Sequence, residues 1–362
     1  MTAPLDAVVM GYASLDSLIT VSHLPAAGTT AIVQGNLDER PHWGGCGPNV
    51  AVGLCRLGLR TGLVSTLGTD ALSRRYRRWL RAQGVDASGL AMVADATAPR
   101  ALMLSAADGA SCCLFAPGAG STPGDDRAQA RLLRRARRLV LTVGPTVLTE
   151  RLVRLALNRA VEIAWGVKAD AAAYPADLVR TLAPACEVVV LNAAELAFLG
   201  SHLGLASAAD LCRLGVRVVV LTRGADGCDV WSANGHLHQP ALPAARIVDT
   251  TGAGDALMSG FLAAYWRSGD VALAARWGVA NAAAVIARRG SQVGLCTVDE
   301  IEAALTEPGM TVHTRERVPG ETGADVPAST GRSAEERPAL APGALRGVAR
   351  LSEKSASCGR GE

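Results

Sequence analysis

The sequence lacks several features by which common protein classes are identified. Aromatic residues make up only 4% of the 362 residues. No run of 18 uncharged apolar residues occurs, so we expect neither a membrane-spanning helix nor a membrane partner. The N-terminus carries an aspartate rather than a basic segment followed by an apolar one, and this argues against a secretion signal. Basic and acidic residues nearly balance, at 36 and 33, which argues against nucleic acid as a partner.

Motifs of metal sites and of common nucleotide-binding loops are also absent. The nine cysteines include no Cys-x-x-Cys pair, and several lie in apolar runs, where cysteine behaves as a small hydrophobic residue. A Walker A loop is excluded because Gly-Lys does not occur, and neither His-Glu-x-x-His nor a Gly-x-Gly-x-x-Gly after the first expected strand is present. His236 and His238 have no evident third ligand, so we interpret them as exposed turn histidines. We expect a cytoplasmic protein of a reducing compartment.

The sequence does contain a regular alternation of short β-prone runs and longer helical runs. Several β-prone runs are continuously apolar, as in strands covered on both faces of a parallel sheet. The expected strands are residues 7–10, 61–67, 138–143, 161–166, 187–191 and 216–222. The expected helices are residues 48–58, 71–83, 125–136, 147–158, 175–183, 193–199, 207–214 and 298–305. This alternation predicts an α/β fold with a doubly wound, mostly parallel sheet flanked by helices.

Three segments depart from this alternation. Residues 18–43 and 92–115 contain short β-prone pieces broken by turns, and Ala107-Asp108-Gly109 indicates a hairpin. We expect these two segments to form a small β-sheet that lies like a lid on the main one. Residues 306–362 contain no Phe, Trp, Tyr or Ile, and 13 of these 57 residues are Gly or Pro. Such a composition cannot bury enough apolar surface to fold alone, so we expect a disordered tail.

The most informative segment is Asp249-Thr-Thr-Gly-Ala-Gly-Asp255. It follows a β-prone piece, residues 246–248, and opens an apolar helical run. Its small residues allow backbone amides to converge at a helix N-terminus, where they bind anions and stabilise the charge that develops in phosphoryl transfer. Asp255 is placed to accept a proton from a substrate hydroxyl. The simpler interpretation, a glycine turn with an aspartate cap, fits a shorter motif better than this one.

This segment resembles the signature of the ribokinase-like (PfkB) carbohydrate and nucleoside kinases. Further segments resemble other motifs of that family and occur in the family's order over residues 5–305. They are Gly11-Tyr-Ala-Ser-Leu-Asp16, Gly44-Gly-Cys-Gly-Pro-Asn49, Asn192-Ala-Ala-Glu195, Leu221-Thr-Arg-Gly-Ala-Asp-Gly227 and Asn281-Ala-Ala-Ala284. The resemblance implies a kinase domain over residues 1–305, with the lid formed by residues 18–43 and 92–115.

By position, the resemblance also implies a role for individual residues. Asp255 would be the general base, and the anion hole would be formed by the amides of Gly252, Ala253 and Gly254. The expected substrate contacts are Ser14, Asp16, Gly44, Gly45 and Asn49. The expected ATP contacts are Asn192, Thr222, Gly224, Gly227 and Asn281. Glu195 would hold Mg²⁺ through water, and a monovalent cation such as K⁺ would be held by carbonyls of Asp249 and Thr251, with further ligands from around 287–291.

Several of these residues also have a simpler, structural interpretation. Asn49 is suited to cap a helix, Glu195 to an ordinary helix surface, and Asn281 to an alanine-rich helix interior. Lys168 follows an expected strand, at the sheet edge where ligands bind, and is either a phosphate contact or a solvated loop lysine.

The function implied by the resemblance is an ATP-dependent kinase that phosphorylates a hydroxyl of a sugar or sugar-like small molecule. Ribokinases carry Asn at the position of Ser14 and Lys at that of Cys46, so a ribokinase in the narrow sense is disfavoured. The alternative is a nucleoside kinase, against which the few aromatic residues of the lid segments argue. A catalytically silent, sugar-sensing protein is a further alternative, disfavoured by the intact Asp255. The resemblance also implies a homodimer through the lid.

Overall fold

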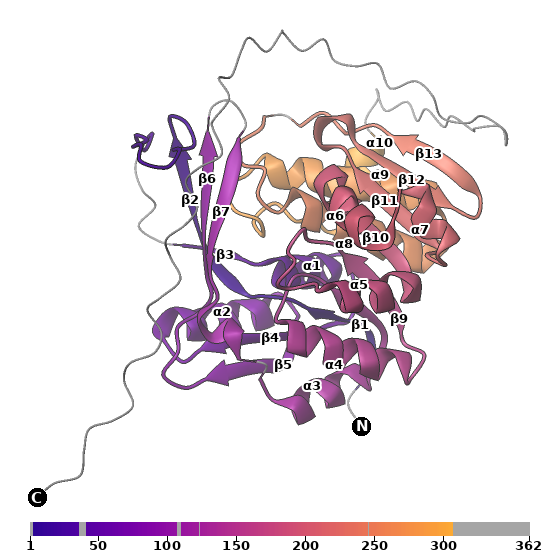
Figure 1. Cartoon of the computed structure of the whole chain (residues 1–362), viewed down its shortest axis with the longest axis horizontal. Helices are drawn as coiled ribbons and strands as arrows, with labels where there is room; N and C mark the ends of the chain where they lie inside the picture. Colours follow the sequence, from indigo (N-terminus) through magenta and orange to yellow (C-terminus); the bar gives the residue numbers. More distant parts are fainter. Residues whose placement is uncertain (1–2, 36–40, 107–109, 123, 245, 307–362) are drawn as a thin grey trace, which may run out of the picture. The chain divides into compact units, whose positions relative to one another are not determined.

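The strands form two sheets in the computed structural model, which describes residues 3–35, 41–106, 110–122, 124–244 and 246–306 (Figure 1). Among these residues the larger sheet has nine strands, in the spatial order β13 (Gly235–Gln239), β12 (Cys228–Ser232), β11 (Val218–Thr222), β10 (Cys186–Asn192), β9 (Glu162–Gly166), β8 (Ala136–Leu141), β1 (Leu5–Met10), β4 (Thr61–Gly68) and β5 (Asp86–Val93). The strands from β11 to β5 are parallel, whereas β12 and β13 add an antiparallel hairpin at one edge.

Helices cover both faces of the larger sheet. One face packs against α1 (Cys46–Arg56), α2 (Ala71–Ala82), α8 (Ala253–Ser268), α9 (Val271–Ile286) and α10 (Val298–Thr306). The other face packs against α3 (Asp126–Leu133), α4 (Thr146–Leu157), α5 (Ala176–Leu182), α6 (Ala193–Leu203) and α7 (Ala209–Arg213). Val188 and Val190 of β10 are buried on the first face, and Val189 and Leu191 on the second. Burial on both faces explains the continuous apolar runs, and the predicted doubly wound α/β fold is confirmed.

Three strands of the larger sheet, β5, β12 and β13, were not predicted from the sequence. Strands β12 and β13 contain Asp229, His236 and His238, which interrupt the apolar pattern. The prediction of a β-prone piece at residues 246–248 is wrong, because this segment pairs with no strand. Instead, the backbone amide of Val248 donates to the carbonyl oxygen of Ile286 at the end of α9, at 2.8 Å.

The smaller sheet is present, with the order β3 (His42–Gly44), β2 (Ser14–Val21), β6 (Arg100–Ala106) and β7 (Ser111–Ala116). It begins at residue 14 rather than 18, because the chain passes from β1 into β2 almost directly. Residues 92–93 belong to β5 of the larger sheet. Strands β6 and β7 are antiparallel, as the predicted hairpin requires, although residues 107–109 of its turn lie outside the described residues.

In the described part of the chain, no helix combines the length and the apolar character that crossing a bilayer requires. The predicted tail, from residue 307 onward, lies outside the described residues, and Thr306 is the last residue of α10.

Candidate active site

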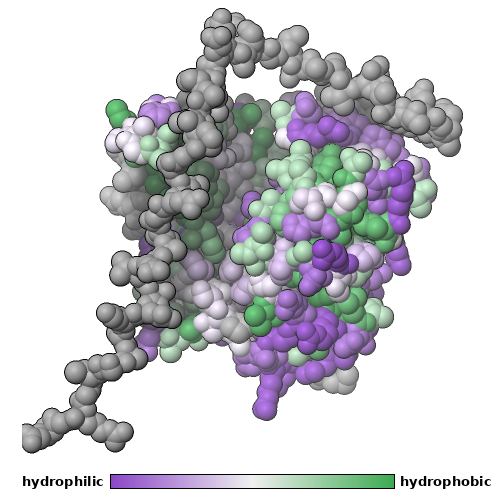
Figure 2. All heavy atoms as spheres, viewed as in Figure 1, coloured by the Kyte–Doolittle hydropathy of each residue, from purple (hydrophilic) through white to green (hydrophobic). Residues whose placement is uncertain are grey.

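The ends of the parallel strands and one face of the smaller sheet line a cavity of about 1040 Å³. The main sheet contributes Asn192 at the end of β10, Thr222 at the end of β11 and the residues that follow β8 and β9. Alternate residues of β2 and β7, together with most residues of β6, line the opposite side. The hollow beside the smaller sheet is visible in the space-filling view of Figure 2. The cavity therefore lies at the carboxyl edge of the sheet, where open α/β sheets bind ligands.

Asp255 lies in the first turn of α8, and its half-buried side chain lines the cavity. Gly252 precedes the helix with φ +81°, and a Cβ there would lie 2.4 Å from the Cβ of Ser291, so the turn requires glycine. Gly252, Ala253 and Gly254 line the cavity beside Asp255, and their role as an anion hole stays a prediction. The amide of Ala253 donates to the carbonyl oxygen of Thr250 at 3.2 Å, so it is partly engaged within the turn.

The carboxylate of Asp255 has a defined polar environment. Asn49 Nδ2 donates to Asp255 Oδ2 at 2.8 Å. Burial raises the pKa of Asp255, while the Asn49 hydrogen bond and the ammonium of Lys168 act in the opposite direction. A carboxylate with a raised pKa that still has hydrogen-bond support is a stronger base than a solvated one.

Asp16 lies on β2 and is almost fully buried, with 5% of its surface exposed. Ser14 Oγ donates to Asp16 Oδ1 at 2.5 Å, so Ser14 acts on the cavity through Asp16 as well as directly. Burial raises the pKa of Asp16 to about 6, against the lowering effect of the Ser14 hydrogen bond. A Cβ on Gly44 would lie 1.9 Å from Asp16 Oδ2, which explains why the neighbouring strand carries glycine there.

Gly45 and Asn49 lie at the start of α1 and complete this side of the cavity. Gly45 is the N-cap of α1, with φ +93°, and a Cβ there would lie 2.1 Å from the carbonyl oxygen of Tyr12. Asn49 is buried and makes no N-cap contact; its amide is bonded to Asp255 instead. The helix-cap interpretation of Asn49 is therefore wrong.

Asn192 and Glu195 both line the cavity, and they also cap α6. Asn192 Oδ1 accepts from the amide of Glu195 at 3.0 Å, and Glu195 Oε2 accepts from the amide of Asn192 at 2.8 Å. This is a capping box. Glu195 is buried, with 8% of its surface exposed, so the interpretation as an ordinary surface residue is wrong.

Three of the predicted ATP contacts do not line this cavity. Gly224 and Gly227 instead shape the loop after β11, where the amide of Gly227 donates to the carbonyl oxygen of Gly224 at 3.1 Å. Asn281 is fully buried: its Nδ2 donates to the carbonyl oxygen of Ala256 at 2.8 Å, and its Oδ1 accepts from the amide of Cys296 at 2.9 Å. Asn281 thus links α8 to α9, and its placement does not support an ATP contact.

The side chain of Asp249 ties the glycine turn to the segment after α9. Asp249 Oδ1 accepts from the amide of Thr251 at 2.9 Å, and its Oδ2 accepts from the amide of Gly290 at 2.8 Å. The residues expected to share a monovalent cation, 249–251 and 287–291, are therefore neighbours. The described residues include no cluster of three or more His, Cys, Asp or Glu side chains that could hold a metal ion.

The family of the chain follows from a match that spans this whole arrangement. The sequence profile described as pfkB family carbohydrate kinase matches residues 7–297, which include all of the cavity residues named above. The chain belongs to the pfkB family of carbohydrate kinases. It is an ATP-dependent kinase that phosphorylates a hydroxyl group of a sugar or a nucleoside.

The relatives of this kinase are named as kinases of nucleosides and of sugar phosphates. It is 28% identical over 306 residues to the nucleoside kinase of Methanothermobacter thermautotrophicus, covering 84% of this chain and 97% of that one. It is 29% identical to the ATP-dependent ribose-1-phosphate kinase of Halopiger xanaduensis, covering 82% and 97%. The crystal structure of Methanocaldococcus jannaschii nucleoside kinase superposes with a TM-score of 0.71 at 21% identity, covering 84% and 99%. The last comparison shows that the fold is the ribokinase fold.

Two cationic side chains of the kinase, Lys168 and Arg289, line the cavity. Lys168 follows β9 and lines the cavity with Asp255 and Glu195. Burial lowers the pKa of Lys168, but the nearby Cys46, Glu195 and Asp255 outweigh this effect and raise it overall. The sequence signal for Lys168 was its position at the carboxyl edge of the sheet. Lys168 is exposed as well as lining the cavity, so the phosphate contact stays a prediction beside the solvated loop lysine.

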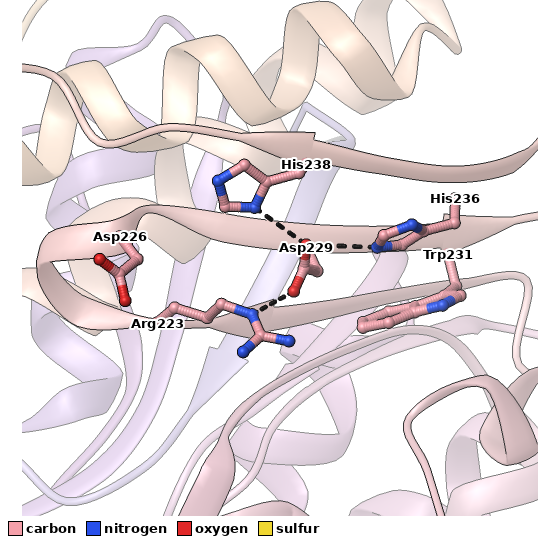
Figure 3. A pocket seen from close by; sticks show the side chains of 6 residues that line it. All are labelled: Arg223, Asp226, Asp229, Trp231, His236 and His238. Carbon is pink, nitrogen blue, oxygen red and sulfur yellow. Dashed lines mark hydrogen bonds and ion pairs between the residues drawn. The ribbon is translucent and has the colours of Figure 1, made fainter. Parts of the chain in front are cut away.

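A second, smaller cavity of about 460 Å³ lies at the β12–β13 hairpin of the kinase (Figure 3). Asp229 accepts hydrogen bonds from His236 Nε2 at 3.2 Å, from His238 Nδ1 at 2.9 Å and from Arg223 Nε. These hydrogen bonds lower the pKa of Asp229 overall, although burial acts to raise it. The interpretation of both histidines as exposed turn residues is wrong, because they lie half-buried on β13 and hold Asp229 in place.

Proposed function

We propose that this kinase transfers the γ-phosphoryl group of ATP to a hydroxyl of a nucleoside. The observation that carries this proposal is the pattern of side chains on the cavity face of the smaller sheet. Asp16 is in register with Ala101 and Phe115, the next row is Leu18, Met103 and Cys113, and all of these residues line the cavity. An apolar band thus lies beside Asp16, and the row beyond it is polar again, with Thr20, Ser105 and Ser111 also lining the cavity.

An apolar surface beside a buried carboxylate fits a nucleoside better than a free sugar. A free sugar carries hydroxyls around its ring and needs polar partners on several sides, whereas a nucleoside has a flat base with apolar faces. Tyr12 also lines the cavity, with its ring centroid 4.8 Å from that of Phe115. The sequence argument against base stacking considered the lid segments alone and so did not count Tyr12. Two of the relatives are named nucleoside kinases, which supports the same choice, whereas the Halopiger relative is named for a sugar phosphate.

In the proposed reaction, Asp255 accepts the proton of the attacking hydroxyl while Asp16 binds a second hydroxyl of the ribose. Ser14 donates to Oδ1 of Asp16, so Oδ2 is available to accept from a ribose hydroxyl. The backbone at residues 252–254 and the ammonium of Lys168 stabilise the negative charge of the phosphoryl group in flight. Thr222 and Asn192 lie where the nucleotide would be bound.

The side chains on the nucleotide side fit hydrated Mg²⁺. Glu195 and Asn192 offer oxygen atoms at the cavity wall, and Mg²⁺ prefers oxygen ligands and retains several waters. When bound, Mg²⁺ neutralises charge on the β- and γ-phosphates. For the monovalent cation we propose carbonyls of Asp249 and Thr251, with K⁺ as the ion; support comes from the Asp249 hydrogen bond to Gly290, which brings the two expected ligand segments together.

A substrate panel tests the proposed acceptor. We expect ADP release with adenosine, inosine, guanosine or cytidine to exceed that with ribose or fructose by about tenfold or more in kcat/KM. Met103→Ser should raise KM for the nucleoside and leave KM for ATP unchanged, because Met103 lies in the apolar row. Replacing K⁺ by tetramethylammonium should lower the rate. Activity with free sugars alone would refute the nucleoside proposal.

Two further properties complete the proposal. We place the protein in the cytoplasm, which the thiols support, since every cysteine of the described residues is free.

We also propose a homodimer through the outer face of the smaller sheet. On that face Leu102 pairs with Leu114, and these side chains are 39% and 58% exposed. Exposed apolar pairs of this kind are typical of an interface.

A further inference from the structure

Behind Asp255 lies a group of buried polar side chains that the proposed reaction does not use. Gln292 follows α9 and has 3% of its surface exposed, and Tyr76 of α2 is fully buried. Both lie on the side of Asn49 that faces away from Asp255. Buried polar groups are costly unless they are hydrogen-bonded, so the partners of this group show what it does.

The hydrogen bonds of this group form one continuous chain that ends at Asp255. Trp79 Nε1 donates to Gln292 Oε1 at 3.0 Å. Gln292 Nε2 donates to Asn49 Oδ1 at 3.0 Å. Asn49 Nδ2 then donates to Asp255 Oδ2 at 2.8 Å. The three links connect the partly buried end of α2, through the segment after α9 and the start of α1, to the first turn of α8.

The donors and acceptors allow these hydrogen bonds to point in only one direction, from Trp79 toward Asp255. An indole N–H can only donate, so it must meet the oxygen of the Gln292 amide and turn the nitrogen toward Asn49. This nitrogen in turn requires the oxygen of the Asn49 amide, which leaves the nitrogen of Asn49 for Asp255. At the other end an ionised carboxylate can only accept. Both ends therefore impose the same orientation on the two amides.

A side branch reinforces this orientation. Gln292 Nε2 also donates to the hydroxyl of Tyr76 at 2.7 Å, and that hydroxyl donates to the carbonyl oxygen of Gly44 at 2.6 Å. The ring of Tyr76 stacks on Trp43 at 4.8 Å with an interplanar angle of 9°. Ser291 Oγ is a second donor to Asn49 Oδ1, at 3.1 Å. Both protons of the Gln292 amide are thus used, so a flipped amide would lose several hydrogen bonds at once.

We propose that Trp79 and Gln292 are positioning residues for phosphoryl transfer, which fix the orientation of the Asn49 amide so that its nitrogen faces Asp255. This inference rests on the proposed role of Asp255 as the base. The Asn49 hydrogen bond holds one carboxylate oxygen and favours the ionised form, so that the carboxylate is ready to accept the hydroxyl proton. If the Asn49 amide were reversed, its oxygen would face Asp255 and disfavour that form.

The other charged and titratable groups around Asp255 take no part in this series of hydrogen bonds. Lys168 follows β9, Cys46 lies on α1, Asp16 on β2 and Glu195 on α6. None of them is altered by substitutions at Gln292 or Trp79. Because Gln292→Glu also adds a charge near Asp255, the pH dependence of the neutral variants Gln292→Met and Trp79→Phe is what reports on these hydrogen bonds alone.

The test uses Gln292→Glu, which can accept from Trp79 but cannot donate to Asn49. The Asn49 amide is then expected to reverse, so kcat should fall by about tenfold or more, and the acid limb of the kcat–pH profile should move to higher pH. KM for ATP should change less than about twofold. Gln292→Met, which introduces no charge, should lower kcat in the same direction. Trp79→Phe removes only the terminal donor and should give a smaller fall.

Two controls separate this inference from the proposed function and from a loss of stability. Gln129→Glu makes the same change at a buried glutamine of α3 that accepts from Arg151, and it should leave kcat and the pH profile unchanged. Asp255→Asn tests the base itself. If Asp255→Asn is inactive while both Gln292 variants keep the wild-type kcat and pH profile, the positioning role is refuted and the base assignment stands. A lower melting temperature with an unchanged pH profile would likewise refute it.

Discussion

The site buries the carboxyl group of Asp16, which is costly for the folded protein when the group is ionised. Asp16 is nearly inaccessible to water, and its pKa is raised to about 6, first of all by burial. A carboxyl group whose pKa is higher in the folded than in the unfolded chain destabilises the fold in its ionised form. Stability is therefore expected to fall as the pH rises from about 4 to about 6, and the penalty is complete above that range.

Asp16→Asn should remove this penalty. With a shift from 3.8 to about 6, the variant should be more stable than the wild type by about 3 kcal/mol at neutral pH, because each pKa unit corresponds to about 1.4 kcal/mol. The difference should vanish below about pH 4, where both side chains are neutral. Urea unfolding at pH 4 and pH 7.5 measures it. A variant less stable than the wild type at pH 7.5 would show that hydrogen bonds of Asp16 offset the free-energy cost of burying its ionised carboxylate. Substrate affinity should fall in either case.

The loop after β11 shows how one element is positioned by another. Arg223 belongs to the motif that resembles the family's nucleotide-side loop, and its side chain is bound to Asp229 of β12. His236 and His238 of β13 donate to the same carboxylate (Figure 3). The hairpin thus holds the loop from outside the larger cavity.

Asp229→Asn should loosen this loop. We expect KM for ATP to rise by about threefold to tenfold with little change in kcat at saturating ATP, because Thr222 at the start of this loop lines the cavity, whereas the base is not disturbed. The matched control is Asp210→Asn, which removes the ion pair with Arg213 on α7. It should leave KM for ATP unchanged. Equal effects of the two substitutions would indicate a general loss of stability instead.

The elements also show what could be predicted from the sequence and what could not. Six of the seven parallel strands were predictable because burial on both faces makes their apolar pattern continuous, whereas β5 at the sheet edge, with Ser88 exposed, was missed. The glycine turn at residues 249–255 was predictable as a site because it needs small residues at fixed positions. The role of Asn49 was not, since its partners Gln292 and Asp255 lie more than 200 residues away along the chain. Strands β12 and β13 were missed because Asp229 and both histidines look like loop residues.

At the scale of the whole molecule, the exposed outer face of the smaller sheet is the feature that predicts an assembly. Leu114→Lys places a charge in the middle of that face, where Leu114 is 58% exposed. We expect the wild-type protein to have the mass of a dimer by light scattering coupled to size-exclusion chromatography, and the variant to have that of a monomer. A wild-type monomer would refute the dimer, and removal of residues 306–362 beforehand shows whether the predicted tail matters.

The central claim is that Asp255 takes the proton of the acceptor hydroxyl beside an anion hole at the start of α8. The most direct measurement is the turnover of Asp255→Asn, followed as ADP release with the best acceptor of the panel. The account predicts a loss of about 10²-fold to 10⁴-fold or more in kcat, with ATP affinity by calorimetry and the melting temperature close to those of the wild type. A variant that keeps most of the wild-type rate would contradict it.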